Sequence, residues 1–303
     1  MNGRKHNRLK WLWISMFVVL TMAAAGGIYI STIYNSVKAT VNEVTHEPIQ
    51  AISAVASKQK VEQRETLNIL LLGVDEREGD RGRSDTMIVM TLNPTNSRMQ
   101  MISIPRDTRT EIVGKGITDK INHAYAFGGN EMSVATVENF LDIDLDYYVR
   151  VNMDGLEQLV DAVGGITVTN ERAFNLDEYS FKKGNIKLNG EQALAYVRMR
   201  KQDPEGDLGR NDRQRQVIQG VLNQGASMTS VTRIHKLIDI LGKNMVTNMK
   251  FDDMQNLVTN YKSVRNELTT YQMTGDGKFI GDIWYLMVSD KEMGKVHEMI
   301  EEF

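Results

Sequence analysis

Residues 67–75 read Leu-Asn-Ile-Leu-Leu-Leu-Gly-Val-Asp, and this stretch decides the fold of the domain that follows it. The run from Asn68 to Val74 is almost wholly apolar and is closed by Asp75. A strand with one solvated face alternates apolar and polar residues, whereas a strand covered on both faces is apolar throughout. The stretch therefore predicts a strand that is buried on both faces.

Strand patterns and helix patterns alternate along the rest of the chain. Strands are predicted at residues 86–92, 100–104, 166–169, 269–273 and 283–288. Apolar residues at helical spacing predict helices at residues 134–141, 156–163, 211–224, 232–246, 251–261 and 290–302. Such an alternation predicts the α/β class, here a three-layer α-β-α sandwich around a mixed central sheet.

The N-terminus carries the pattern of a membrane anchor. Four basic residues (Arg4, Lys5, Arg8 and Lys10) precede an uncharged apolar run over residues 11–30. A helix needs roughly 20 apolar residues to cross a bilayer core, and the basic flank stays in the cytoplasm. We therefore expect a cytoplasmic tail (1–10), a transmembrane signal-anchor (11–31), a juxtamembrane stalk (32–66) and an extracellular catalytic domain (67–303).

A cleaved signal peptide is the alternative for this segment, since the small residues Ala23, Ala24 and Ala25 resemble a cleavage site. The apolar run continues past them to Ile30, which favours an uncleaved anchor. The predicted protein is thus a single-pass type II protein of the cell membrane.

Composition and motif content exclude several classes of protein. The 303 residues carry a net charge of −3, which argues against a nucleic-acid-binding field over the whole protein. The chain has no cysteine and only five histidines, so thiolate chemistry is excluded and zinc hydrolysis is disfavoured. No Gly-x-Ser-x-Gly elbow, P-loop or Gly-x-Gly-x-x-Gly fingerprint is present.

The first candidate site segment surrounds the end of the opening strand. Asp75 sits where a buried strand ends, a position at which α/β sheets present functional groups. If residues 83–89 are extended, Arg83 and Asp85 share a face. Two carboxylates with phosphate oxygens suit Mg²⁺. A solvated acidic loop with ordinary ion pairs is the equal alternative on this segment alone.

The second segment follows the strand predicted at residues 100–104. Arg106 could clamp a phosphate with its planar set of donors, and Asp107 could hold that arginine or cap the next turn. For Arg109, a turn with a surface salt bridge is the better interpretation. Farther along, Lys120 could add a phosphate contact, whereas His123 suits a structural role.

The third segment is the most informative. If residues 195–200 are extended, Tyr196, Arg198 and Arg200 lie on one face, and the two arginines require a shared anion. In the helix predicted next, Arg210 and Gln214 project towards the apolar stripe of residues 217–222, while Arg213 and Arg215 flank it. Charged groups on an inward face are costly unless a polar ligand awaits them. Pairing with Asp203, Glu205, Asp207 or Asp212 is the alternative.

Six ordered blocks in these segments resemble the LytR-CpsA-Psr family of bacterial cell-envelope phosphotransferases, and most closely its teichoic-acid-transferring members in Gram-positive bacilli. The blocks are Leu-Leu-Gly-Val-Asp (71–75), Arg-Ser-Asp-Thr (83–86), Ile-Pro-Arg-Asp (104–107), Asp-Lys-Ile-Asn-His (119–123), Tyr-Val-Arg-Met-Arg (196–200), and Gly-Arg (209–210) with Arg-Gln-Arg-Gln (213–216). The resemblance covers residues 67–225 and the N-terminal anchor.

The resemblance implies transfer of an anionic glycopolymer, a wall teichoic acid, from an undecaprenyl-pyrophosphate carrier to peptidoglycan. It implies Mg²⁺, or alternatively Mn²⁺, on Asp75 and Asp85. The pyrophosphate would be bound by Arg83, Arg106, Lys120, Arg198, Arg200, Arg210 and Gln214. Of these, Arg83, Arg106, Arg198 and Arg200 are also catalytic candidates, as is Asp85, the candidate general base.

Two other functions use the same residues. One is a non-catalytic sensor or regulator that binds polyprenyl phosphates, and the other is a lipid-pyrophosphate phosphatase in which water replaces the sugar acceptor. In each case the prenyl chain needs an apolar groove, for which the helices predicted around residues 134–141 and 156–163 are candidates.

Overall fold

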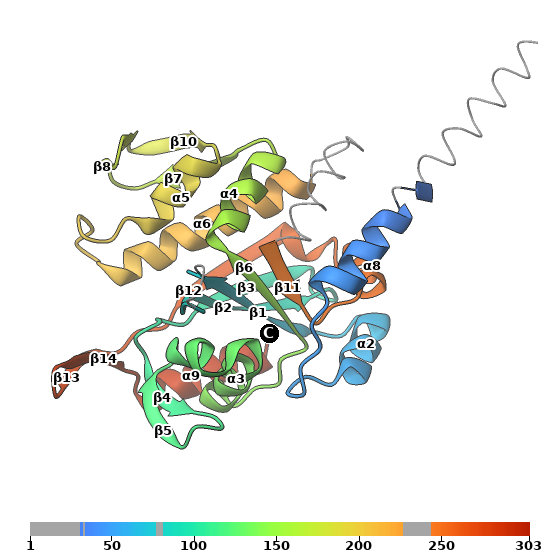
Figure 1. Ribbon diagram of the computed structural model, residues 1–303, viewed down its shortest axis with the longest axis horizontal. Helices are drawn as coiled ribbons and strands as arrows, with labels where there is room; N and C mark the ends of the chain where they lie inside the picture. Colours follow the sequence, from blue (N-terminus) through green and yellow to red (C-terminus); the bar gives the residue numbers. More distant parts are fainter. Residues whose placement is uncertain (1–30, 33, 77–80, 227–243) are drawn as a thin grey trace, which may run out of the picture.

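The computed structural model describes residues 31–32, 34–76, 81–226 and 244–303 (Figure 1). Its centre is a six-stranded sheet in the order β11-β6-β1-β2-β3-β12. These strands are β1 (Leu67–Val74), β2 (Ser84–Asn93), β3 (Arg98–Ser103), β6 (Tyr147–Asn152), β11 (Met245–Thr247) and β12 (Glu267–Gln272). The β1–β6 and β3–β12 pairs are parallel and the other three pairs antiparallel, so the predicted mixed sheet is confirmed.

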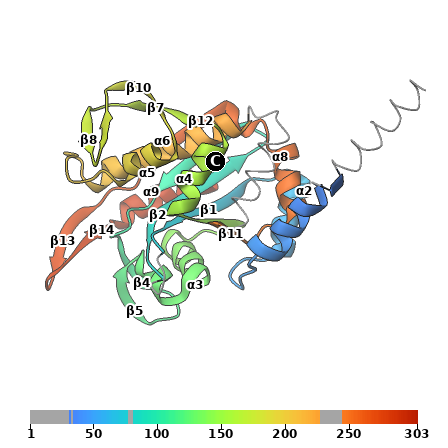
Figure 2. The same cartoon turned by 45° about the horizontal axis from the view of Figure 1, so that its top comes forward.

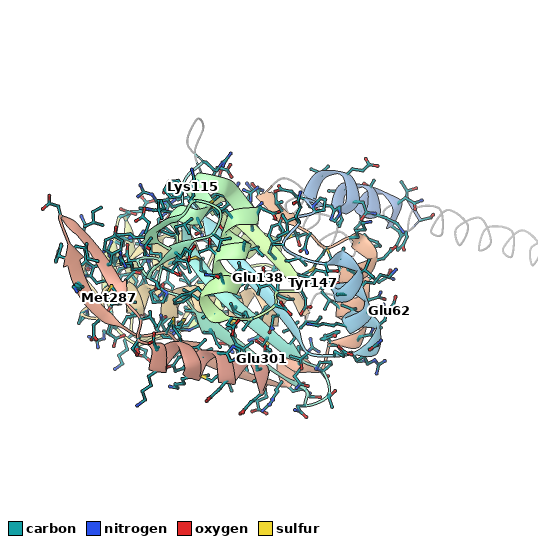
Figure 3. The ribbon with its side chains drawn as sticks, turned by 90° about the horizontal axis from the view of Figure 1, so that it is seen from below. Glu62, Lys115, Glu138, Tyr147, Met287 and Glu301 are labelled. Carbon is teal, nitrogen blue, oxygen red and sulfur yellow. The ribbon has the colours of Figure 1, made fainter. Side chains whose placement is uncertain are left out.

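One face of the sheet is covered by α3 (His123–Leu141) and α9 (Asp290–Glu301), which lie side by side in the view from below (Figure 3). Leu70, Leu72 and Val89 of the sheet meet Val137 of α3 and Val296 of α9 in one closed core. All five side chains are at most 1% exposed. This face is packed as a conventional protein interior.

The other face is covered by α4 (Met153–Ala162), α5 (Gly190–Arg198) and α6 (Asp207–Ala226), as Figure 1 shows. Their shared core includes Val160, Ala193, Tyr196 and Val217. Helices therefore lie on both faces of the sheet, in the three-layer arrangement that the alternation of elements predicts. The end of α4 is also as predicted, since Gly164 and Gly165 both have positive φ.

Four hairpins and several short helices complete the described domain. The hairpins are β4–β5 (Arg109–Ile112, Ile117–Lys120), β8–β9 (Phe174–Leu176, Tyr179–Phe181), β7–β10 (Ile166–Asn170, Gly184–Leu188) and β13–β14 (Asp276–Ile280, Ile283–Met287). The helices are η1 (Thr40–Thr45), α2 (Ala54–Gln63), α8 (Phe251–Asn260) and η2 (Val264–Asn266). The strand predicted at residues 283–288 thus belongs to a separate hairpin and not to the central sheet.

The segment expected to form a stalk packs on the domain over much of its length. Val41, Ile49, Ile52 and Val61 are buried, and the last three join the cores on the sheet. Within the described residues, no helix is both long enough and apolar enough to cross a bilayer. The predicted span at 11–31 lies outside those residues, apart from residue 31 itself. Its anchoring role stays a prediction.

Two of the predicted helices differ from expectation in their extent or position. The helix expected at residues 232–246 lies mostly outside the described residues, and its last two positions belong to strand β11. The helix at residues 134–141 forms, but Val134 and Phe140 fill the closed core beside α9. It therefore cannot line a groove on the opposite face, because the sheet lies between them.

Candidate functional site

A cavity of about 510 Å³ lies between the central sheet and helices α4, α5 and α6. Its walls are mostly apolar, with side chains from four strands (β1, β2, β6 and β11) and from the helices above them. The apolar lining includes Ile69, Leu71, Met90, Val149, Val151, Leu156, Leu159, Val217, Ile218, Val221, Leu222, Met245 and Met249. Of the two helices predicted to line a groove, the one at residues 156–163 is confirmed in that position.

The polar residues of the cavity come from the ends of strands and helices. Asp85 and Thr86 stand at the start of β2, Arg198 at the end of α5, and Arg210 and Gln214 in the first turns of α6. The predicted inward direction of Arg210 and Gln214 is confirmed, since both line the cavity together with the apolar stripe of α6. The arrangement suits a ligand with an anionic head and a long apolar tail.

Asp85 owes its position to an irregularity in the sheet. Gly73 pairs with Thr86 and Val74 with Ser84, so Asp85 is an extra residue in β2. A bulge of this kind redirects a side chain that would otherwise follow the pleat. The Asp85 Oδ1 accepts a 2.6 Å hydrogen bond from Arg106 Nη1, which holds the carboxylate at the cavity wall.

Asp207, the first residue of α6, is the centre of an arginine cluster. Its Oδ1 lies 2.7 Å from Arg210 Nη2, 3.7 Å from Arg200 Nε and 3.8 Å from Arg106 Nε. These contacts are ionic, since within the described residues both Asp207 oxygens are buried without a hydrogen-bond partner. Three guanidiniums thus contact the carboxylates of Asp207 and Asp85, and Arg198 lies with Asp85 in the lining of the cavity.

Arg210 is 7% exposed, and its Nε and Nη2 are buried without a hydrogen-bond partner among the described residues. The Arg106 Nε is in the same condition. Unsatisfied buried donors of this kind call for an explanation, and an anionic ligand supplies one. Burial lowers the pKa of Arg210, whereas for Arg106 the charge and hydrogen bond of Asp85 outweigh burial and raise the pKa. Both groups remain charged at neutral pH.

Lys120 contacts the arginine cluster only indirectly, through Asp107. Its Nζ lies 2.7 Å from Asp107 Oδ1, and Asp107 Oδ2 lies 3.7 Å from Arg106 Nε. Lys120 therefore neutralises the carboxylate behind Arg106, and it does not line the cavity described above. His123 receives a structural role as expected, because its Nδ1 lies 2.7 Å from Asp119 Oδ2.

Asp75 and Arg83 lie where β1 and β2 meet. The Asp75 N–H donates to the Arg83 carbonyl at 3.2 Å, and Arg83 is exposed immediately before β2. Among the described residues, no group of three or more His, Cys, Asp or Glu side chains could hold a metal by itself. Two carboxylates, Asp75 and Asp85, fit the manner in which Mg²⁺ binds when substrate phosphates and water complete its shell.

The expected extended face of Tyr196, Arg198 and Arg200 is wrong. Residues 190–198 form α5, which begins with a capping box in which Asn189 and Gln192 bond each other's backbone N–H groups. Tyr196 is therefore fully buried in the helical core, while Arg198 and Arg200 are exposed. The two arginines still reach the site, because α5 ends beside the start of α6.

The arginines that flank the α6 stripe are structural. The pairing alternative also holds for the inward arginine, because Arg210 pairs with Asp207 at 2.7 Å. Arg213 binds Asp203 at 2.6 Å and donates to the Tyr196 carbonyl, which ties α6 to α5. Arg215 donates to Ser103 at 2.8 Å and to Gln272 at 2.9 Å, which ties α6 to strands β3 and β12.

Two parts of the site escaped prediction. Asp207 figured only as one possible partner for an arginine, although its carboxylate contacts three of them. Strand β6, which supplies Val149 and Val151 to the cavity, was not predicted at all. Its sequence Tyr-Tyr-Val-Arg-Val-Asn is rich in aromatic and β-branched residues, and this signal could have identified it.

Known proteins resemble this chain over most of its length. The model of the LytR_cpsA_psr family matches residues 28–302. Polyisoprenyl-teichoic acid–peptidoglycan teichoic acid transferase TagU of Oceanobacillus iheyensis is 48% identical over 305 residues, which cover 97% of this chain and 94% of that protein.

Solved structures agree with this match. The crystal structure of B. subtilis TagU has 45% identity and a TM-score of 0.65, covering 78% of this chain and 96% of that one. A structure described as TagT bound to LIIa-WTA has 30% identity and a TM-score of 0.66, covering 78% and 90%.

Proposed function

Because the chain belongs to the LytR-CpsA-Psr family, we propose that it transfers an anionic glycopolymer, a wall teichoic acid, from an undecaprenyl-pyrophosphate carrier to peptidoglycan. Its relative TagU, named as a polyisoprenyl-teichoic acid–peptidoglycan teichoic acid transferase, supports a polyisoprenyl-linked teichoic acid as donor and peptidoglycan as acceptor. The proposal accounts for a site that joins an arginine cluster to an apolar cavity.

One observation carries this proposal. The buried guanidinium of Arg210 forms an ion pair with Asp207 through Nη2, but its Nε has no hydrogen-bond partner among the described residues, and it stands at the wall of a 510 Å³ apolar cavity. A prenyl pyrophosphate matches both parts, because its phosphate oxygens accept from the arginines while its hydrocarbon tail fills the cavity. Neither a soluble sugar phosphate nor a simple lipid would use both.

The cavity has a direction that suits this substrate. The register of β1 and β2 places Gly73 opposite Thr86, next to Asp85. Four residues earlier in β1, Ile69 lies opposite Met90. The pyrophosphate would lie among Arg106, Arg198, Arg200 and Arg210, and the tail would extend towards Met90 and the later turns of α6.

The proposed reaction is a phosphoryl transfer. An acceptor hydroxyl oxygen attacks the phosphorus that carries the glycopolymer, and the bond from that phosphorus to the bridging oxygen breaks. Polyprenyl phosphate leaves, and the hydroxyl proton passes to Asp85, whose carboxylate Arg106 holds in place. The arginines neutralise the charge that spreads over the phosphate oxygens, which is the main requirement of such a transition state.

A divalent metal belongs to the proposal as well. Asp75 and Asp85 would hold Mg²⁺, or Mn²⁺ in its place, and the ion would neutralise phosphate charge when bound. Lys120 and Asp107 would keep Arg106 oriented behind the phosphate, and Gln214 would donate to a phosphate oxygen. Arg83, exposed at the start of β2, would bind the distal part of the pyrophosphate.

The proposal also includes an extracellular position for the domain. An N-terminal anchor at residues 11–31 would keep the domain at the surface of the membrane that holds the lipid donor. Tethering of this kind raises the effective concentration of the donor without any new contact.

The test is a transfer assay with the purified full-length chain in detergent, a lipid-pyrophosphate-linked polymer and peptidoglycan fragments. We expect polymer-bearing fragments and polyprenyl phosphate in equal amounts, and loss of both when EDTA removes divalent metal. Equal release of polyprenyl phosphate with and without fragments would identify a phosphatase instead. Binding of donor without any turnover would identify a sensor.

A further inference from the structure

The β13–β14 hairpin projects from the domain (Figures 1 and 2). Several of its apolar side chains are exposed to solvent. Phe279 is 68% exposed, Ile283 49% and Trp284 36%. The two-residue turn begins at Gly281, whose φ of +60° is a conformation that favours glycine. A defined turn and complete strand pairing make this a formed element with an uncovered aromatic surface.

The root of the hairpin is attached to the candidate site. The Leu286 N–H donates to the Asp107 carbonyl at 2.9 Å, and Leu286 forms a parallel bridge with Thr108. The Tyr285 hydroxyl donates to Asp119 at 3.2 Å. Asp107 binds Lys120 and is the neighbour of Arg106 in the sequence. The hairpin therefore contacts the residue that follows an arginine of the cluster.

Trp284 presents a flat surface because of the residue beneath it. A Cβ placed on Gly277 would lie 3.0 Å from the indole Nε1 and 3.1 Å from Cζ2, so the ring rests on the glycine backbone. Phe279 pairs directly with Trp284 across the strands and shares its face of the hairpin. The result is an aromatic platform, formed by Gly277, Phe279 and Trp284.

The platform lies away from the segment that leads to the predicted anchor. In the view from below, Met287 at the root of the hairpin and Glu62 on α2 stand at opposite sides of the molecule (Figure 3). Figures 1 and 2 likewise show the hairpin and the helices of residues 34–63 at opposite ends. The hairpin is therefore placed for the acceptor side of the site, away from the lipid.

We propose that the aromatic platform binds the glycan strand of the peptidoglycan acceptor, an inference that rests on the proposed function. One face of a pyranose ring exposes C–H groups, which pack on the electron-rich face of an indole or phenyl ring. Asp282, in the turn next to the platform, can accept hydrogen bonds from hydroxyl and amide groups, whereas Asp276 and Lys278 lie on the opposite face of the hairpin. Two acids to one base do not suit an anionic membrane surface.

The test uses the full-length chain with Phe279 and Trp284 both changed to alanine. With peptidoglycan glycan strands as acceptor, we expect the acceptor KM to rise about tenfold, with kcat and donor affinity unchanged. Binding of a β-1,4-linked N-acetylglucosamine hexamer, followed by isothermal titration calorimetry, should weaken by the same factor. Gly277→Val keeps both aromatic rings but displaces the indole, and it should weaken hexamer binding too.

Val258→Ala is the matched control, because Val258 is 76% exposed on α8 and lies outside the hairpin. An unchanged acceptor KM and unchanged hexamer binding in the double variant would overturn the proposal. So would a loss confined to binding of anionic phospholipid vesicles, or to self-association in sedimentation. If the unaltered chain transfers no polymer, the proposed function fails, yet hexamer binding still tests the platform separately.

Discussion

The two faces of the central sheet are made from the same strands but have different interiors. On the face towards α3 and α9, Leu70 is fully buried and lies in a closed core. On the face towards α4, α5 and α6, Ile69 and Leu71 line a cavity of about 510 Å³. Residues one position apart in β1 thus fill a closed core on one side and line a cavity on the other.

The difference shows how a domain can hold a large apolar ligand without losing its fold. Apolar walls around a void forgo dispersion contacts that a packed interior would make. The closed face and its helices can supply the stability of the sheet while the open face does without those contacts. Substitutions should therefore have opposite consequences for stability and activity on the two faces.

The largest expected effect is on activity at the open face. Arg210→Ala and Arg198→Ala should each lower the rate of polymer transfer at least about 100-fold, because each removes a donor to charged phosphate oxygens. Arg198 is exposed, so its loss should leave thermal unfolding unchanged. Arg172→Ala, at an arginine whose side chain is 59% exposed, is the control and should transfer normally. Near-normal transfer by both site variants would remove the proposed roles.

The next largest expected effect is a loss of stability at the contact between helices α4 and α5, which cover the cavity. Gly190→Ala should destabilise the protein by about 2–3 kcal/mol, because overpacking forces backbone apart. The new Cβ would lie 2.3 Å from the Glu157 carbonyl oxygen of α4. Gly294→Ala, at an exposed position of α9, is the counterpart on a helix of the closed face, because a Cβ there meets nothing within 4 Å. That change should stabilise the protein by about 0.5–1 kcal/mol. Thermal unfolding measures both variants, and a Gly190→Ala protein more stable than the Gly294→Ala protein would contradict this prediction.

A matched pair of tryptophans distinguishes packed from open apolar surface. Val137→Trp, on α3 in the closed core, should cost about 2 kcal/mol of stability or more, as overpacking does. Leu156→Trp, on α4 at the cavity wall, should change stability by less than about 1 kcal/mol because space is present. The second variant should instead lose affinity for polyprenyl phosphate. Equal destabilisation by both would mean that the cavity is not open to side chains.

The smallest effect is a pH dependence on the closed face. Burial raises the pKa of Glu138 on α3 to about 7, and Asp144 and Asp146 add to the shift. The folded state therefore keeps a proton that the unfolded chain releases near its ordinary pKa of 4.5, so stability falls as the pH rises from about 4.5 to 7.

Glu138→Gln should flatten this dependence by about 1 kcal/mol, an amount reduced because the side chain is only part-buried. Chemical denaturation at pH 5 and pH 8 measures it, and Glu111→Gln at an exposed position is the control. A variant that keeps the slope of the unaltered chain would show that Glu138 titrates normally.

Much of the sheet could be predicted because its strands are marked by local composition. The apolar run before Asp75 predicted β1, and the inward direction of Arg210 and Gln214 followed from helical periodicity. In both cases the pattern of side chains along one element carries the information. Long-range contacts were not needed for either prediction.

Other features depend on contacts that no single segment encodes. The bulge at Asp85 follows from the register between β1 and β2, and the role of Asp207 follows from three arginines that converge from separate elements. The cavity exists because helices α4, α5 and α6 leave space between themselves and one face of the sheet. Leu70 and Leu71 are both leucines, so residue type does not indicate which of them faces the closed core and which faces the cavity. The α5 helix was mistaken for an extended segment because its alternating arginines hid a helical core around Tyr196.

The order of strands in the sheet has a consequence for synthesis of the chain. Its four inner strands come from residues 67–152, whereas both edges, β11 and β12, come from residues 245–272. A chain synthesised up to residue 226 therefore has only the four inner strands of the sheet, and both outer strands of this partial sheet are unpaired. Unpaired edge strands are the surfaces through which different molecules aggregate. Premature termination in this interval should yield aggregates, and folding of the chain benefits from a holding chaperone until its last quarter emerges.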